Sequence, residues 1–185
     1  PMGIKAMFFV VSDLVAIEDR EEARQFIVRH VQPGLSMEKL PPYLNSMNWS
    51  DLELLLEQGH TIGAHTRTHS RLSEISSSDG LEEEIVSSAD SLGNRLGVRV
   101  EHFAYTFGDL ASFSPVALAV ARSCFQFIYT GLRGHNASGV APWAIRRDAM
   151  TANDSLSLVG ALLEGGADRF YATNLAVYES WCQEA

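Results

Sequence analysis

The sequence predicts one α/β domain built around a mostly parallel sheet, and two observations carry that prediction. Four segments are predicted to be strands, at residues 5–11, 61–64, 98–105 and 124–130; the first is a continuous apolar run and the last is rich in aromatic and β-branched residues. Segments with apolar residues at helical spacing separate these predicted strands. Strands that alternate with helices form βαβ units, which assemble into parallel sheets or barrels. Because the chain has no linker, repeat or low-complexity tract, we expect a single domain over residues 1–185.

The first half of the chain supplies two strands and two helices. Residues 5–11 (KAMFFVV) are a continuous apolar run, as in a strand that is covered on both faces. A helix is predicted over residues 23–31, and a Pro-Gly pair ends it. In the next helix Ser50 and Glu53 have the spacing of a capping box. Gly59 suits the left-handed C-terminal cap of that helix.

The second half repeats the alternation. A helix is predicted to begin at Asp79, with Glu82 three residues later, and to close at Gly97. Ser114-Pro115 places a capping residue and then a proline at the first turn of the following helix.

Beyond the fourth strand the pattern weakens. Residues 131–142 (GLRGHNASGVAP) have the composition of a loop, and a last helix is predicted over residues 154–163. Residues 168–185 favour neither helix nor loop.

Composition and charge exclude several classes of function. The net charge of −9, from 14 basic and 23 acidic residues, argues against a nucleic-acid-binding surface and against docking on anionic lipid. No run approaches the roughly 18 apolar residues that span a bilayer. We see no signal peptide, so a cytoplasmic location is favoured. Cys124 and Cys182 are predicted to be reduced thiols, because two isolated cysteines form neither a disulfide framework nor a Cys-rich zinc site.

The most informative stretch is residues 59–70 (GHTIGAHTRTHS). His65 and His69 are four apart, a spacing that lets two imidazoles share one cation, and neutral imidazole suits zinc, cobalt or nickel. They directly follow a predicted strand, where ligands gather in parallel α/β folds. Two histidines fall short of the three protein ligands of a catalytic zinc, so structural histidines are the alternative. We interpret His30 and His60 as structural.

The run GHTIGAHTRTHSRL resembles the histidine motif of the polysaccharide deacetylase family, the NodB-homology domain of carbohydrate esterase family four. That family has H-[ST]-x-x-H after a G-H-x-I-G strand. KAMFFVV is similar to the family strand KATFFV, and FAYTFG at residues 103–108 is similar to the turn F-[RA]-x-P-[YF]-G. The resemblance covers about residues 4–150. It implies a distorted (β/α)7 barrel of the NodB type.

The resemblance also implies a metal-dependent hydrolase that removes N-acetyl or O-acetyl groups from a polysaccharide or amino sugar. His65 and His69 would be ligands of a divalent metal, most often zinc in this family. The backbone N–H of Phe107 would donate to the developing oxyanion. This chemistry needs a Lewis acid, an activated water and such a donor. The implied partner is a carbohydrate, and the sequence does not indicate the oligomeric state.

Two family motifs have no counterpart in the sequence. The family's T-F-D-D-G run supplies the general base and an aspartate ligand, and without it the barrel is expected to lack its first strand through N-terminal truncation. The late L-x-H motif, which supplies the general acid, is also missing, and His135 does not match it. Asp13 fits neither aspartate role and is interpreted as a loop residue. Ala104 and Thr106 replace the arginine and proline of the family turn. The general base therefore stays unidentified.

Arg146, Arg147 and Asp148 resemble an arginine-containing strand segment of some family branches. Arg147 or Asp148 would orient groups near the site, and a surface salt-bridge cluster is the alternative. At the level of function, three readings stay open: an active deacetylase, a catalytically inactive carbohydrate-binding or regulatory module, and an α/β domain with structural histidines.

Overall fold

The computed structural model describes residues 3–166 and 168–184. Its centre is a parallel sheet of four strands in chain order, which are β1 (Met7–Val10), β2 (Thr61–Ala64), β3 (His102–Ala104) and β4 (Phe127–Tyr129). Because each strand pairs with its successor, right-handed crossovers place the connecting helices on one side, as in a barrel. The sheet stays open: β1 is an edge strand, and a single bridge from Tyr129 to Ile145 extends the β4 side. The parallel α/β class and the incomplete barrel are confirmed.

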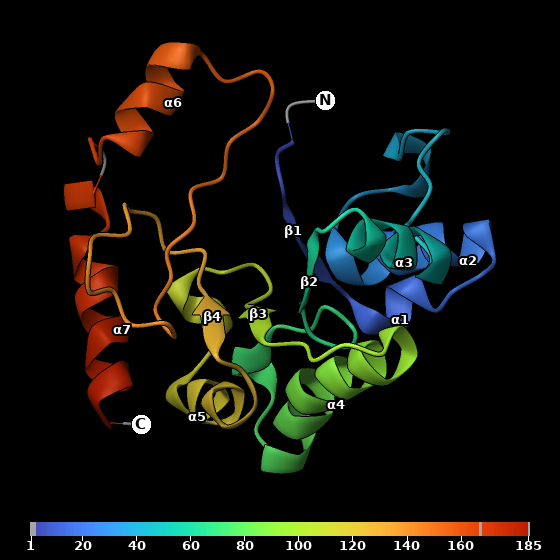
Figure 1. Cartoon of the computed structure of the whole chain (residues 1–185), viewed down its shortest axis with the longest axis horizontal. Helices are drawn as coiled ribbons and strands as arrows, with labels where there is room; N and C mark the ends of the chain where they lie inside the picture. Colours follow the sequence, from blue (N-terminus) through green and yellow to red (C-terminus); the bar gives the residue numbers. More distant parts are fainter. Residues whose placement is uncertain (1–2, 167, 185) are drawn as a thin grey trace.

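Helices surround this sheet, as Figure 1 shows. The described residues form α1 (Ser12–Val15), α2 (Arg20–Phe26), α3 (Trp49–Glu57), α4 (Ser78–Leu96), α5 (Pro115–Cys124), α6 (Leu156–Leu163) and α7 (Ala172–Glu184). A π-turn at Ile27–Val31 continues α2, and short 3-10 turns lie at Met37–Lys39, Leu72–Glu74, Leu110–Ser112 and Asp168–Phe170. Within the described residues, no helix combines the length and the apolar character that crossing a membrane requires.

The hydrophobic core lies between one face of the sheet and the long helices. Alternate strand residues point into it, and Ile62, Phe103 and Ile128 are at most 4% exposed. Helices α4 and α5 cover them with apolar residues that are also buried, which are Leu81, Ile85, Leu92, Ala117 and Leu118. On the opposite face Phe9 and Tyr129 are half-buried, with ring centroids 5.0 Å apart. Burial of each large core side chain contributes about 1.5–3 kcal/mol to stability.

Two predicted helix caps are wrong. Helix α3 is capped by Asn48, which forms a reciprocal box with Asp51, so Ser50 already lies inside the helix. Helix α4 is capped by Ser77, whose side chain accepts from the Gly80 N–H, and not by Asp79. In both cases a second capping residue stood two positions earlier, and the earlier one starts the helix.

Other local predictions are confirmed. Gly59 and Gly97 have φ of +78° and +66° after α3 and α4, and Ser114 caps α5 by accepting from the Ala117 N–H. Both cysteines are free thiols. Three strands are shorter than the predicted runs, and Cys124, the first residue of the last run, is the final residue of helix α5.

Three segments depart from the prediction. The segment that carries Asp13 is the short helix α1, and not a loop. The last predicted helix begins two residues later than expected, at Leu156 with Ser155 as its cap. The ambiguous tail forms α7, whose Tyr178 and Trp181 pack edge-on against Phe113.

Candidate functional site

Two histidine rings meet at the C-terminal end of β2. His65 directly follows the strand, where its N–H donates to the Val10 carbonyl at 2.9 Å. The ring of His69 lies edge-on to that of His65, with centroids 5.1 Å apart and an interplanar angle of 76°. Parallel strands present their C-terminal ends to a common surface, so this is the edge of the sheet where a ligand is expected.

Each ring is oriented by a backbone carbonyl. The Nδ1 atom of His65 lies 2.7 Å from the Ala104 oxygen, and the Nδ1 atom of His69 lies 3.1 Å from the His30 oxygen. A carbonyl only accepts, so both Nδ1 atoms carry the proton and both Nε2 atoms keep a free lone pair. A carbonyl acceptor behind the ring is the usual way in which proteins fix the tautomer of a metal-binding histidine.

Burial keeps both rings neutral at physiological pH. Loss of solvent lowers the pKa of His65 from 6.5 to about 4, against the opposing effect of its bond to Ala104. The pKa of His69 is also lowered, first by burial, while the bond to His30 opposes the shift. Because neutral imidazole is the form that binds metals, no proton has to leave either ring first.

The geometry of the pair fits two ligands of one ion. A tetrahedral zinc roughly 2.0–2.1 Å from each nitrogen would hold two imidazole centroids about 5 Å apart, and the observed separation is 5.1 Å. Within residues 3–166 and 168–184, no group of three or more His, Cys, Asp or Glu side chains is placed to hold a metal ion. The described residues thus bring two imidazoles together without a third ligand of these types beside them.

The turn after β3 lies against the histidines. Phe107 packs edge-on against His69, with ring centroids 4.9 Å apart, and has a φ of +59°, which is uncommon for a bulky residue. Its backbone N–H donates to no acceptor in the described part of the chain. The following Gly108 must be glycine, because a Cβ atom there would lie 2.6 Å from the Gly131 Cα. The turn thus presents a free backbone donor beside the histidine pair.

A cavity of about 460 Å³ opens beside His65, and Phe107, Arg147 and Asp148 line it. The Arg147 side chain is fixed by hydrogen bonds from Nε to the Thr130 oxygen at 2.8 Å and from Nη2 to the Tyr105 oxygen at 3.3 Å. Its neighbour Arg146 instead pairs with Glu179. Arg146 thus forms an ion pair, whereas Arg147 and Asp148 line the cavity.

Among the described residues, His65 is the one histidine that lines this cavity. The His60 Nδ1 atom accepts from the Ala6 N–H at 3.0 Å, and His135 is hydrogen-bonded to Asp168. His30 contributes its carbonyl to the site, a role that the sequence did not indicate. A larger cleft of about 860 Å³, lined in part by Trp49 and Arg95, includes none of the histidines.

Comparisons with known proteins agree on one family. The family model described as "Polysaccharide deacetylase" matches residues 2–124. No curated protein sequence gives a significant match.

Solved structures of low sequence identity share the fold. The deacetylase PplD of Streptococcus pyogenes, in complex with acetate, is 17% identical with a TM-score of 0.64, over 87% of this chain and 59% of that one. A de-N-acetylase of Aggregatibacter actinomycetemcomitans is 15% identical with a TM-score of 0.59, over 86% and 65%. BC0361, a polysaccharide deacetylase of Bacillus cereus, is 20% identical with a TM-score of 0.56, over 66% and 38%. The chain spans less than two thirds of each of these proteins.

Proposed function

The chain belongs to the polysaccharide deacetylase family, and on that premise we propose that it is the metal-binding part of a hydrolase that removes acetyl groups from a carbohydrate. The single observation that carries the proposal is the pair of neutral, carbonyl-oriented rings of His65 and His69. Among proteins of the same fold, one is described in complex with acetate and another as a de-N-acetylase. These descriptions support an N-acetylated sugar as the substrate class, with an O-acetylated sugar as the close variant.

In this proposal His65 and His69 hold one divalent cation, for which zinc is the first choice because imidazole nitrogen is among its preferred ligands. When bound, such an ion supplies Lewis acidity to the acetyl carbonyl and lowers the pKa of a bound water. The chain's own contribution is preorganisation, since Ala104 and His30 fix the two rings before any ligand arrives.

The Phe107 turn supplies the second element of the proposed site. Its backbone N–H is the oxyanion donor, placed on a turn that packs against His69. A donor of this kind is typically worth about 10²–10³ in rate, because negative charge develops on the carbonyl oxygen during attack. Arg147 keeps its guanidinium anchored in the wall of the cavity, where the sugar would bind. Asp148 lines the same cavity and is the first carboxylate to substitute in a search for the general base.

The direct test is acetate release from N-acetylglucosamine oligomers by the 185-residue chain, with zinc and after chelation. We expect slow release that needs zinc, because a missing general base costs about 10²–10⁴ in rate. His69→Ala should abolish it, whereas His135→Ala, which changes an exposed histidine outside the cavity, should not. Release that survives chelation would contradict metal dependence. Binding of the oligomers with no release at any zinc concentration would favour the inactive carbohydrate-binding module.

A further inference from the structure

The turn that carries His69 has an unusual backbone. Thr66 and His69 have φ of +59° and +67°, a left-handed conformation that residues with a side chain seldom adopt. Such conformations persist only where the surrounding structure holds them in place. The side chain of Thr66 contributes one restraint, since its Oγ1 accepts from the His69 N–H at 2.9 Å.

The strongest restraint comes from Glu84 on helix α4. Its Oε2 accepts from the Thr68 N–H at 2.9 Å, and its Oε1 accepts from the Thr68 hydroxyl at 2.6 Å. Its backbone oxygen also accepts from the Arg67 N–H at 2.9 Å. One helical residue thus binds two consecutive residues of the turn, directly before His69.

These hydrogen bonds stabilise the Glu84 carboxylate as well as the turn, because the carboxylate is buried. Glu84 is 9% exposed, and none of the ion pairs between described residues includes it. A buried carboxylate is costly unless hydrogen bonds compensate it, and Thr68 donates both of the bonds that it receives. The next residue on the same helix face, Ser88, donates to the Thr66 oxygen at 3.0 Å.

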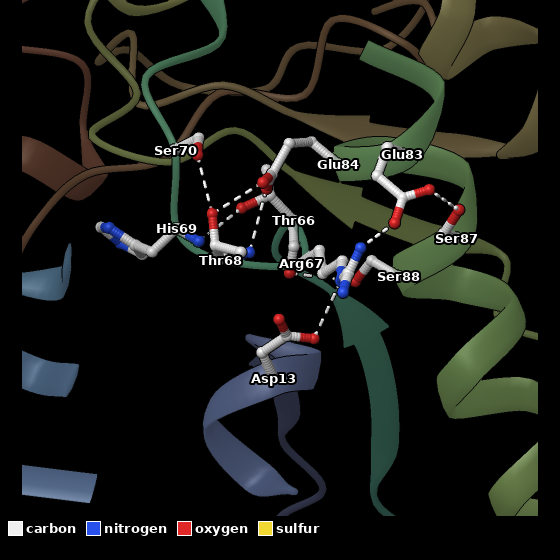
Figure 2. A network of polar contacts seen from close by, with 10 residues as sticks. All are labelled: Asp13, Thr66, Arg67, Thr68, His69, Ser70, Glu83, Glu84, Ser87 and Ser88. Atoms are coloured by element: carbon white, nitrogen blue, oxygen red, sulfur yellow. Dashed lines mark hydrogen bonds and ion pairs between the residues drawn. The ribbon is translucent and has the colours of Figure 1, made fainter. Parts of the chain in front are cut away.

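Figure 2 shows that this network does not include the imidazole of His69. The backbone of residues 66–70 faces Glu84 and Ser88, while the His69 ring points away from them. The neighbouring Glu83 points elsewhere, toward Arg67, which also pairs with Asp13 at 3.1 Å. Two adjacent glutamates on α4 therefore have different roles, and only Glu84 holds the turn through direct bonds to Thr68.

We infer that Glu84 is a positioning residue for the metal site, which fixes the His69 turn through Thr68 and touches neither metal nor substrate. The inference rests on the proposed function, because it assigns His69 to a metal. If residue 84 were exposed and made no contact with the turn, the turn would not require a glutamate at that position. Substitution of the partners that orient metal ligands typically lowers metal affinity about 10–100-fold.

The first experiment measures the metal-free protein, so it does not depend on the proposed function. In Glu84→Ala the Thr68 amide loses its acceptor, and the His69 amide, which is bonded to Thr66 Oγ1, loses the turn conformation that Glu84 supports. Both amide protons should then exchange with solvent at least about tenfold faster. The His65 amide, which is bonded to Val10, should be unchanged. The matched control is Glu83→Ala, which removes the exposed neighbour and should leave all three amides as in the wild type.

The second experiment measures zinc affinity by calorimetry. Glu84→Ala should weaken binding about 10–100-fold, and Glu84→Gln should recover most of the loss, because an amide can accept from the Thr68 N–H and donate to its hydroxyl. In a His69→Ala background the Glu84→Ala change should have less than about a twofold effect, since the two residues act as one unit. If Glu84→Ala does not fold, Thr68→Val removes the hydroxyl bond alone and should show the same effects in weaker form.

Three results would overturn the inference: wild-type exchange in Glu84→Ala, an equal loss of zinc affinity in the His69→Ala background, or no rescue by Glu84→Gln. A wild-type chain that binds no zinc would instead count against the proposed function. The exchange measurement would still decide whether Glu84 holds the turn.

Discussion

Acid should destabilise the metal-free protein through His65. The folded state lowers the pKa of His65 from 6.5 to about 4, because burial disfavours the charged ring. Between pH 6.5 and pH 4, His65 is therefore protonated in the unfolded chain but neutral in the folded chain. The free energy of unfolding falls as the pH falls. With a pKa of 6.5 in the unfolded chain and about 4 in the folded chain, the free energy of unfolding falls by about 2 kcal/mol between pH 7.5 and pH 5. It falls by about 3 kcal/mol between pH 7.5 and pH 4. Above about pH 7.5 the contribution is complete and constant.

Urea denaturation at pH 7.5, 6, 5 and 4 would measure this loss. In His65→Asn the side-chain amide can still donate to the Ala104 oxygen but does not titrate, so the difference between variant and wild type isolates His65. His135→Asn, at an exposed position, serves as the control. Equal pH profiles for wild type and His65→Asn would show that His65 titrates normally and is not held neutral by burial.

Four further substitutions, in two pairs, test how the turn and the helix caps are built. Gly108→Ala should destabilise the fold by about 1–3 kcal/mol, because the new Cβ would meet Gly131 at a φ of +81°. Gly160→Ala, in helix α6 with open space around it, should instead stabilise by about 0.5–1 kcal/mol, and thermal unfolding of both variants decides. Asn48→Ala should cost about 1 kcal/mol as the loss of a true cap. Ser50→Ala should lower the free energy of unfolding only slightly, because Ser50 is already inside the helix. If Ser50→Ala destabilises the protein more than Asn48→Ala does, Ser50 is the N-terminal cap after all.

Local patterns predicted the strands and helices well. The strands at residues 5–11 and 61–64 and the glycines that end helices are indicated by patterns only a few residues long. These patterns can be interpreted without knowledge of the tertiary structure. Strand ends were less predictable, because hydrogen-bond pairing decides them: β3 is reduced to His102–Ala104 within the strand predicted at residues 98–105. The tail contains a helix whose Tyr178 packs on Phe113, a long-range contact that its own sequence does not indicate.

The same distinction applies to the site. The spacing of His65 and His69 is a local signal, and it indicated the two residues whose rings meet. The acceptors behind the rings are backbone oxygens of Ala104 and His30, and any residue type can supply a backbone oxygen. Glu84 stands among three consecutive glutamates, and only the helix face that packs on the turn distinguishes it from its neighbours.

Zinc titration of the metal-stripped chain tests the central claim most directly. We predict one site per chain whose affinity falls by at least about tenfold in His65→Ala and in His69→Ala, and stays unchanged in His135→Ala. Calorimetry at pH 7.5, where both rings are neutral, measures all four proteins. Zinc binding that survives the loss of both His65 and His69, or that is absent from the wild type, would contradict the account.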